Sequence, residues 1–456
     1  MKIVVLAGSP KGEMSITLQY VRYIQKKNPA HLFIIIQIGN QIRKLEKDAA
    51  AFQAVLDEIR RADAVLWCFP VYFLMVPSPL KRFIELVLER HAEAAFAGKY
   101  ATALTTSVHF YDHTAHNYIR AISEDMGMQA IPGFSADMED LLKPAGRAGF
   151  ISFALNFIRT IAAQAPVEKA FAPVNVSIPE YLSPAIPDVP KTGRRRIVLL
   201  TDAGEADVNL RRMTDAFVRF LPNAVDVVNI NSLDLKGGCL GCCQCGDNNV
   251  CVYHDDLMPL FRDKLMPSDA IVFAGRIRDR YLSARWKMFF DRSFCNGHAP
   301  VMMGKQMAWI VSGALRQLPN LRQLLEAEAE MGRMYLAGIV TDEDADSVRI
   351  TALLRDLATR LLRHVEENTP VQPTFLSVGG HKIFRDLIYE LRFVFRADYR
   401  FFAKHGMFDY PQKNIRKRLQ SGFLSLLMAI PAFRPAFFRM AKSRMLEPYQ
   451  KIVDQA

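Results

Sequence analysis

Cysteine is scarce in this 456-residue chain except in one short loop. Residues 239–251, "CLGCCQCGDNNVC", hold five of the seven cysteines, and the other 443 positions hold two. Cysteines spread over the chain, as a disulfide framework would need, are therefore lacking. The cluster indicates metal or redox ligands in a compartment where thiols stay reduced.

The chain also lacks the hydrophobic segments typical of export or membrane insertion. It begins "MKIVVLAGSPKG", without the charged start, long apolar middle and small-residue cleavage site of a signal peptide. No uninterrupted apolar run is long enough to cross a bilayer. We therefore expect a cytoplasmic protein.

Excess charge is absent from most of the chain. The net charge is +11, and residues 371–456 contribute +9 of it, with 15 Lys and Arg against 6 Asp and Glu. The nearly neutral remainder argues against a nucleic-acid groove across the main fold.

Two successive sets of strand-like segments alternate with helical ones. In the first half they are 2–9, 31–38, 63–70, 100–107 and 128–135; in the second half they are 195–202, 224–231, 269–276, 307–314 and 335–342. This alternation predicts two tandem α/β domains, each a doubly wound, parallel, five-stranded sheet of the flavodoxin-like type. The predicted boundaries are domain 1–165, Pro-rich linker 166–193, domain 194–368 and a basic, mainly helical extension 369–456.

The two halves share an ungapped register. Asp63 and Asp269 both open a strand, 206 positions apart, and the same offset pairs Lys81 with Lys287 and Gly98 with Gly304. A register that is kept without gaps over some 36 residues is more than similar composition of the two halves would produce. We interpret it as an internal duplication.

The turn after the first strand, "LAGSPKGEMSITLQY", predicts an anion site. Backbone N–H groups and the positive end of the following helix dipole meet there, and Gly8 permits a tight turn. Hydroxyl or ammonium donors follow at Ser9, Lys11, Ser15 and Thr17. A loop of this composition can also be a simple helix cap.

The loops after strands three and four converge with this turn at the carboxyl edge of such a sheet. With "GSPKGEMSIT" and "PVYFLMVPSPLKRF", residues 1–365 resemble the flavodoxin-like NAD(P)H-dependent FMN reductase family. The resemblance implies that the FMN phosphate is held by Ser9, Lys11, Ser15 and Thr17. It also implies that two further segments surround the isoalloxazine ring: Pro70, Val71, Tyr72, Phe73 and Leu74, and Thr106, Ser107 and His109. The alternative for Tyr72 and Phe73 is packing, and for His109, His113 and His116 a polar helix start.

The matching turn of the second half, "LLTDAGEADVNLRRM", has lost this character. Asp202, Glu205 and Asp207 would repel a phosphate, so this turn should not hold FMN. Arg276 and Arg278 replace Pro70 and Tyr72. These arginines are either solvated or face the anionic cofactor or acidic groups of the first domain.

The cysteine loop has the spacing Cys239-x2-Cys242-x2-Cys245-x5-Cys251, with Cys243 in addition. Four thiolates suit an iron–sulfur cluster or zinc. The loop resembles that of the iron–sulfur flavoproteins, a branch of the same family, which implies a [4Fe–4S] cluster on these four cysteines. A zinc site and a metal-free thiol loop remain the alternatives.

These features together predict an FMN-dependent oxidoreductase. The duplicated sheets would form an intrachain pseudo-dimer that brings the FMN of one half near the cluster of the other, with a homo-oligomer left open. Electrons would come from NAD(P)H or a ferredoxin-like protein and leave to a redox partner protein or a small-molecule acceptor. No residue stands out as an acid or base, and hydride transfer to a flavin needs none. The alternatives are a flavin or quinone reductase with a structural cysteine loop, and a non-catalytic redox sensor.

The basic extension alternates aromatic, aliphatic and basic residues at roughly helical spacing. Its most apolar stretch, "GFLSLLMAIPAF", is too short to span a bilayer and is broken by Pro431. Three interpretations are open: helices packed on the sheets, peripheral contact with an anionic membrane, and docking of an acidic redox partner.

Overall fold

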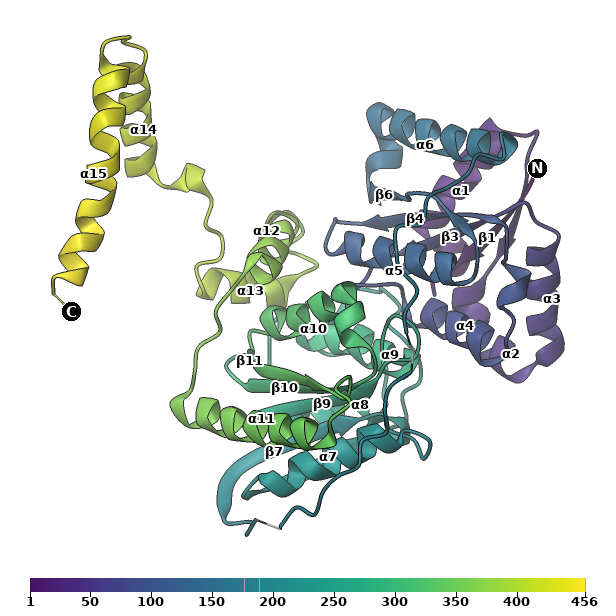
Figure 1. Ribbon diagram of the computed structural model, residues 1–456. Helices are drawn as coiled ribbons and strands as arrows, with labels where there is room; N and C mark the ends of the chain where they lie inside the picture. The colour runs from purple at the N-terminus through teal and green to yellow at the C-terminus, as the bar shows by residue number, and fades with distance from the viewer. Residues whose placement is uncertain (176, 188, 456) are drawn as a thin grey trace. The chain divides into compact units, whose positions relative to one another are not determined.

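The computed structural model describes residues 1–175, 177–187 and 189–455, and two parallel sheets organise most of them (Figure 1). The first sheet has the order β2-β1-β3-β4-β5, and β6 also pairs with β4. Its strands are β1 (Lys2–Ala7), β2 (Leu32–Ile36), β3 (Ala64–Pro70), β4 (Tyr100–Ser107), β5 (Gln129–Ala130) and β6 (Phe134–Asp137).

Helices cover both faces of this sheet, which is why β3 at its centre is apolar throughout. Alternate residues of β1 point to opposite faces. Ile3 and Val5 pack in one hydrophobic cluster with α1 and α6, and Val4 and Leu6 pack in another with α4 and α5. The helices of this domain are α1 (Ile16–Lys27), α2 (Ile38–Lys47), α3 (Ala49–Arg60), α4 (Ser78–Glu89), α5 (Asp112–Asp125) and α6 (Pro144–Ala162).

The fifth strand position is filled by two short pieces, β5 and β6, rather than by one strand. Pro132, in the break, has no N–H for a ladder hydrogen bond. Gly133 lies so close to α5 that a Cβ there would be 2.5 Å from Nδ1 of His116. The side chain of His116 therefore packs against the break between β5 and β6.

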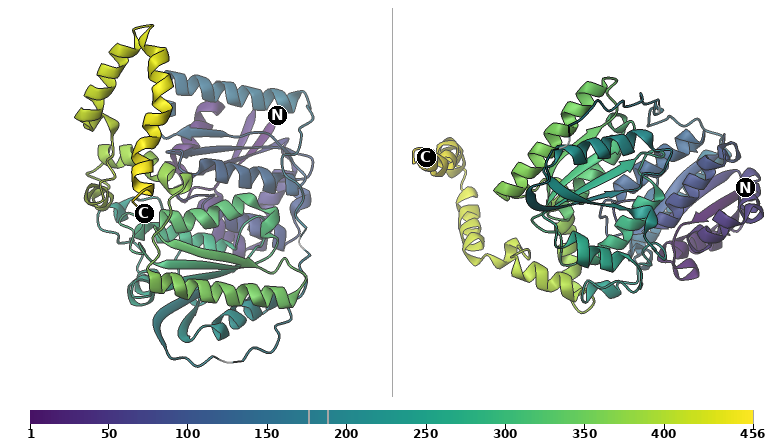
Figure 2. Two further views of the ribbon diagram at one scale, coloured as in Figure 1. Left: turned by 60° about the vertical axis from the view of Figure 1, so that its left-hand side comes forward. Right: turned by 90° about the horizontal axis from the view of Figure 1, so that it is seen from below.

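The second sheet repeats the order of the first, as β8-β7-β9-β10-β11. Its strands are β7 (Gly193–Thr201), β8 (Asn223–Asn229), β9 (Ala270–Arg276), β10 (Gln306–Ser312) and β11 (Tyr335–Thr341). Its helices are α7 (Val208–Phe220), α8 (Leu257–Leu260), α9 (Ala284–Ser293), α10 (Pro319–Met331) and α11 (Ser347–Glu367), with α10 and α11 on opposite faces (Figures 1 and 2). Strand order 2-1-3-4-5 is that of the flavodoxin-like fold. The predicted tandem fold is confirmed.

The two domains pack together through α4 and α9. Glu85 accepts a hydrogen bond from the backbone N–H of Ala284 at 2.6 Å, and Asp291 accepts one from the N–H of Ser78 at 2.8 Å. Each contact becomes the other when 206 is added to or subtracted from the residue numbers. Mutual exchange of contacts is the property of a two-fold, self-complementary interface.

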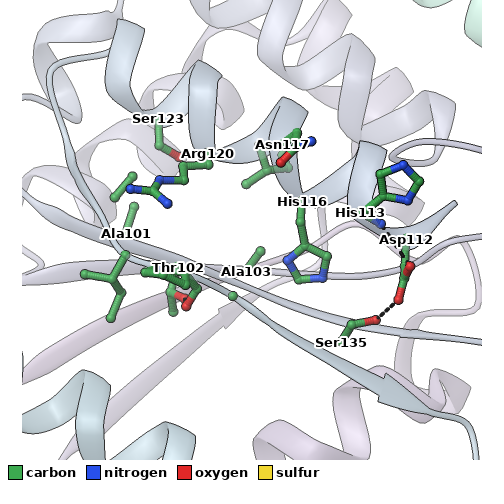
Figure 3. A pocket seen from close by; sticks show the side chains of 15 residues that line it. Ala101, Thr102, Ala103, Asp112, His113, His116, Asn117, Arg120, Ser123 and Ser135 are labelled. Atoms are coloured by element: carbon green, nitrogen blue, oxygen red, sulfur yellow. Dashed lines mark hydrogen bonds between the residues drawn. The ribbon is translucent and has the colours of Figure 1, made fainter. Parts of the chain in front are cut away.

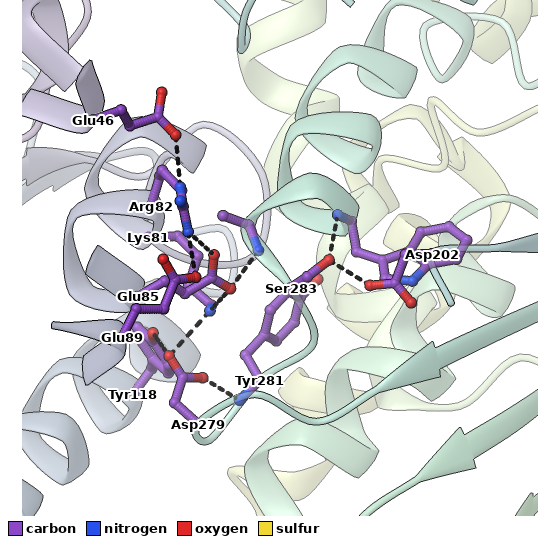
Figure 4. A network of polar contacts seen from close by, with 12 residues as sticks. Glu46, Lys81, Arg82, Glu85, Glu89, Tyr118, Asp202, Asp279, Tyr281 and Ser283 are labelled. Atoms are coloured by element: carbon purple, nitrogen blue, oxygen red, sulfur yellow. Dashed lines mark hydrogen bonds and ion pairs between the residues drawn. The ribbon is translucent and has the colours of Figure 1, made fainter. Parts of the chain in front are cut away.

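Buried lysines complete each half of this interface. Lys81 lies 2.7 Å from Glu85 and 3.0 Å from Asp279, which also accepts a hydrogen bond from Tyr118 (Figure 4). Its counterpart Lys287 pairs with Asp291 and donates to the backbone carbonyl of Phe73 at 2.9 Å. Although burial opposes it, the carboxylates of Asp279 and Glu85 raise the pKa of Lys81. Lys81 therefore stays charged in the core between the domains.

The rest of the chain is helical. It comprises α12 (Phe375–Glu390), α13 (Arg396–Lys404), α14 (Ile415–Met428) and α15 (Phe433–Val453). Residues Met1–Tyr399, which contain both sheets, form one compact unit, and Arg400–Ala456 form a second, here called the C-terminal unit. Among the described residues, no helix combines the length and apolarity needed to cross a membrane.

Candidate functional site

The predicted phosphate turn connects β1 to the N-terminus of α1. Ser15 is the N-cap of α1, and its Oγ accepts a hydrogen bond from the N–H of Leu18 at 3.4 Å. Ser9 Oγ accepts one from the N–H of Lys11 at 3.2 Å. Ser9, Ser15 and Thr17 are buried, while the Lys11 side chain is exposed. Hydroxyls at the positive end of a 12-residue helix, with a lysine at its rim, suit an anionic group.

The loops after β3 and β4 meet this turn, as predicted. Thr17 and Thr106 share a hydrogen bond of 2.6 Å between their hydroxyls. Val71 donates its N–H to the carbonyl of Thr106 at 3.1 Å, and Ser107 accepts the N–H of His109 at 2.9 Å. The three segments therefore come together at the carboxyl edge of the first sheet.

The loop after β3 has an unusual backbone at Leu74. Leu74 has φ of +57°, and the N–H of Met75 donates to the carbonyl of Phe73 at 2.7 Å across it. The Thr114 hydroxyl holds the Leu74 carbonyl in place. A left-handed leucine is uncommon, and such conformations gather at ligand sites. The predicted isoalloxazine loop is thus fixed in a shape that its sequence alone would not favour.

His109 is half exposed at the third loop, with its Nδ1 2.8 Å from Asp112 Oδ2. Asp112 also accepts a hydrogen bond from Ser135 at 2.5 Å. Burial opposes ionisation of Asp112, but the bonds from Ser135 and His109 hold its pKa below the usual range. His113 and His116 instead line a cavity of about 310 Å³ along α5, beside the break in the fifth strand (Figure 3).

The matching site of the second domain is filled by its own carboxylate. Asp207, the buried N-cap of α7, accepts the N–H of Gly204 at 2.9 Å. Arg276 and Arg278 reach its two oxygens at 3.0 and 2.8 Å. Of the two alternatives for these arginines, contact with acidic groups of the first domain is therefore wrong, because an acid of their own domain pairs with both, and their side chains are partly exposed. A cavity of about 470 Å³ remains there, and linker residues Val174, Ile178 and Glu180 line one side of it.

The cysteine loop lies between β8 and α8 and depends on left-handed backbone at Gly241 and Cys243, with φ of +61° and +59°. Cys239, Cys245 and Cys251 are half-buried, and Cys242 and Cys243 are exposed. In the described part of the chain, no three His, Cys, Asp or Glu side chains stand in an arrangement ready to hold a metal ion. The four cysteines therefore share a loop without converging on one point.

Donors surround two of these sulfurs. His298 Nε2 lies 3.1 Å from Cys245 Sγ, and its Nδ1 lies 2.8 Å from Asp398. A hydrogen bond from Cys295 lowers the pKa of the Cys251 thiol to about 5 against the effect of burial, helped by the backbone N–H of Tyr253 and then by the nearby Arg292 guanidinium. Arg292 is buried, and its Nε–H has no hydrogen-bond partner of normal geometry among the described residues. The surroundings thus favour a thiolate at Cys251, whereas burial raises the pKa of the Cys239 and Cys245 thiols to about 12.

Sequence reasoning missed His298, Asp398 and Arg292, and it gave Cys295 no role. These residues lie far along the chain from the cysteine loop and follow no spacing rule. Phe294 and Cys295 begin the short 3-10 helix that follows α9, which places this segment beside the loop. A histidine three residues after an isolated cysteine was the only signal available.

The cysteine loop also touches the first domain. A Cβ at Gly241 would lie 2.5 Å from Cζ of Tyr72, and one at Gly238 would collide with Oγ of Ser78. Burial raises the pKa of the Tyr72 phenol, and Ser9 opposes this by hydrogen bonding. Tyr72 therefore stands between the phosphate turn of one domain and the cysteine loop of the other.

The sheet order and the three converging loops define a flavodoxin-like protein with a candidate anion site at the carboxyl edge of its first sheet. The chain belongs to the NADPH-dependent FMN reductase family, whose pattern matches residues 1–139 and again 197–342. The second match confirms the duplication. Membership makes this chain an FMN-dependent oxidoreductase, as predicted.

Two curated proteins are similar to parts of the chain. The iron–sulfur flavoprotein of Archaeoglobus fulgidus is 26% identical over 212 residues, which are 43% of this chain and 93% of that protein. The quinone reductase of Pseudomonas putida is 30% identical over 111 residues, which are 23% of this chain and 59% of that protein.

Solved structures of similar fold each match about a third of the chain. An NADH:FMN oxidoreductase in its apo form has a TM-score of 0.31 and 20% identity, over 37% of this chain and 91% of that one. The flavoenzyme NAD(P)H:(acceptor) oxidoreductase of Paracoccus denitrificans has a TM-score of 0.31 and 19% identity, over 36% and 97%.

Proposed function

We propose that the chain passes electrons from NAD(P)H through FMN on the first domain to a [4Fe–4S] cluster on the cysteine loop of the second, and on to an acceptor. The acceptor is a redox protein or a small molecule. The two domains act as an intrachain pseudo-dimer. One observation carries the proposal: Tyr72 of the predicted flavin loop lies against Gly241 of the cysteine loop.

The first-domain site suits FMN in its chemistry. The family binds this cofactor, and the turn offers the hydroxyls of Ser9, Ser15 and Thr17 with Lys11 at the rim. These groups would hold the phosphate, and the backbone around Leu74 would follow the ring edge. Bound FMN supplies hydride acceptance and one-electron release. The protein residues bind and orient it, and none of them acts as an acid or base.

The cysteine loop suits a cluster in its donor set. Cys239, Cys242, Cys245 and Cys251 would be the ligands, and such a cluster supplies one-electron transfer. Bound thiolates are negatively charged, and hydrogen bonds to sulfur adjust cluster potential. The Arg292 guanidinium, which lies beside Cys251, and the imidazole of His298, 3.1 Å from Cys245 Sγ, would serve as these donors. Asp398 would fix the orientation of His298.

Composition of anaerobically purified protein tests the cofactors. We expect bound FMN and about four iron atoms and four sulfides per chain, with little zinc. Cys242→Ser should lose most of the iron. Cys243→Ser is the matched control, since Cys243 lies in the same loop outside the proposed ligand set, and it should keep the iron. Equal loss of iron in both variants, or no iron in any of them, contradicts the cluster.

Anaerobic titration with NADPH tests the electron path. The iron signal should bleach together with the flavin signal. If the iron centre stays oxidised while bound FMN becomes fully reduced, the two cofactors are not connected and the proposed path is wrong.

A quinone reductase with a structural cysteine loop is the second candidate. It is favoured by the cysteine arrangement, in which no described group of three ligands is ready to hold a metal ion. The similarity to the Pseudomonas putida quinone reductase points the same way. Protein with FMN, no iron and rapid NADPH:quinone turnover would establish this function instead.

A further inference from the structure

The C-terminal unit concentrates the positive charge of the chain. Between Arg400 and Ala456 there are 11 Lys and Arg against 3 Asp and Glu, which gives +8 of the total +11. A unit of 57 residues with this balance attracts anionic surfaces.

Helix α14 in this unit is apolar on two sides, and its neighbour covers only one. None of its residues is buried. It contacts α15, and Leu424, Leu427 and Met428 are partly covered. Large apolar side chains recur elsewhere on α14 at intervals of four, four and three, and 63–74% of their surface is exposed: Ile415, Leu419, Phe423 and Leu426.

This spacing places the four side chains on one helical face. Packing of the helical pair therefore leaves an apolar stripe in water. Contiguous apolar surface of this kind on a folded protein marks an interaction site.

Exposed basic residues lie on the same two helices, and Arg416 and Arg418 flank the stripe on either side at its N-terminal end. Arg416, Lys417 and Arg418 lie in the first turn of α14, and Arg434 and Arg439 lie on the exposed surface of α15. A helix with an apolar stripe and flanking Lys and Arg is typical of binding in the plane of an anionic bilayer. An acidic protein would match the charge but would set four large apolar side chains against polar groups. A lipid surface accommodates both features.

We propose that the C-terminal unit binds the surface of an anionic lipid membrane. Ile415, Leu419, Phe423 and Leu426 enter the boundary between headgroups and acyl chains, while Arg416 and Arg418 on either side contact the headgroups. The helices lie in the membrane plane and do not cross it. The inference is independent of the proposed electron path.

Co-sedimentation of the full chain with vesicles tests it. Binding to phosphatidylcholine vesicles that contain phosphatidylglycerol should be strong at low salt and weaken as salt rises, with little binding to phosphatidylcholine alone. The triple variant Leu419→Gln, Phe423→Gln, Leu426→Gln should bind roughly tenfold more weakly or worse, because three side chains no longer enter the apolar boundary.

The matched control is Leu142→Gln with Val348→Gln. These residues are equally exposed, at 76% and 70%, but belong to the unit that holds the two sheets. The control should bind vesicles as the parent chain does. Circular dichroism of both variants should show unchanged helix content.

Three results would overturn the proposal. The first is no binding of the parent chain to anionic vesicles. The second is binding that the triple variant retains, since charge alone would then explain it. The third is strong hydrogen-exchange protection of Leu419–Leu426 in the parent chain without vesicles, combined with loss of that protection in the triple variant. The stripe would then be covered by protein, either by this chain or by a second copy.

Discussion

Replacing Lys81 with Met should strongly destabilise the contact between the domains. The Lys81 side chain is fully buried, 2.7 Å from Glu85 of its own helix and 3.0 Å from Asp279 of the other domain. Methionine keeps most of the volume but leaves two carboxylates in the interface without their ammonium group. Breaking a buried ion pair in this way costs about 3–5 kcal/mol. Arg82 lies 3.3 Å from Glu85, so it compensates the charge of Glu85 but not that of Asp279.

Urea unfolding followed by tryptophan fluorescence measures this loss, because Trp67, Trp286 and Trp309 are fully buried and report on both domains. The control is Lys264→Met, which removes an exposed pair with Asp226 and should cost about 1 kcal/mol or less. The double variant Lys81→Met, Asp279→Asn should recover part of the loss. If Lys81→Met costs no more than the control, the ion network does not hold the domains together.

Three further predictions concern single positions. Thr17→Val, which removes a hydroxyl and its bond to Thr106, should weaken FMN binding about tenfold by fluorescence titration, whereas Thr160→Val, half-buried on α6 and bonded only to its own helix, should not. Gly241→Ala should destabilise the chain by about 1–3 kcal/mol in urea unfolding, because Gly241 has φ of +61° and Tyr72 occupies the space of a Cβ. The control is Gly422→Ala, in open space on α14, which should be neutral or slightly stabilising. Burial raises the pKa of Glu328 to about 8 from 4.5, so the folded state holds a proton that the unfolded state releases, and stability should fall as pH rises from about 5 to 8. Glu328→Gln should reduce this fall by on the order of 1–3 kcal/mol.

Each of these has a contradicting result. Unchanged FMN affinity in Thr17→Val would show that the Thr17 hydroxyl is not part of the phosphate site. Equal stability of Gly241→Ala and its parent would mean that the cysteine loop does not approach Tyr72. An identical pH profile in Glu328→Gln would show that Glu328 is ionised in the folded chain.

The sequence predicted what depends on local pattern. Runs such as "KIVVLA" and "RIVLLT" are strands because both faces of a parallel sheet are covered, and the 206-residue register gave the duplication. The three loops of the first site follow from the rule that strand ends converge. These features need only chain order and hydrophobic spacing.

What the sequence left out depends on which side chains meet across the fold. Arg276 and Arg278 have the same charge wherever they point, and only the folded backbone brings Asp207 between them. The sequence shows the 206-position offset between Lys81 and Lys287. It does not show that each lysine is buried at the contact between the domains. His298 and Asp398 are 100 positions apart and meet only because α13 packs beside the segment after α9.

The covalent joining of the two sheets alters how their contact responds to concentration. Two separate chains meeting through α4-like helices would come apart on dilution, whereas here the partner is always supplied by the linker. Joining also lets the two copies diverge. In a symmetric pair, an aspartate that fills one anion site would fill both; in this chain Asp207 fills one while Ser9 and Thr17 remain in the other.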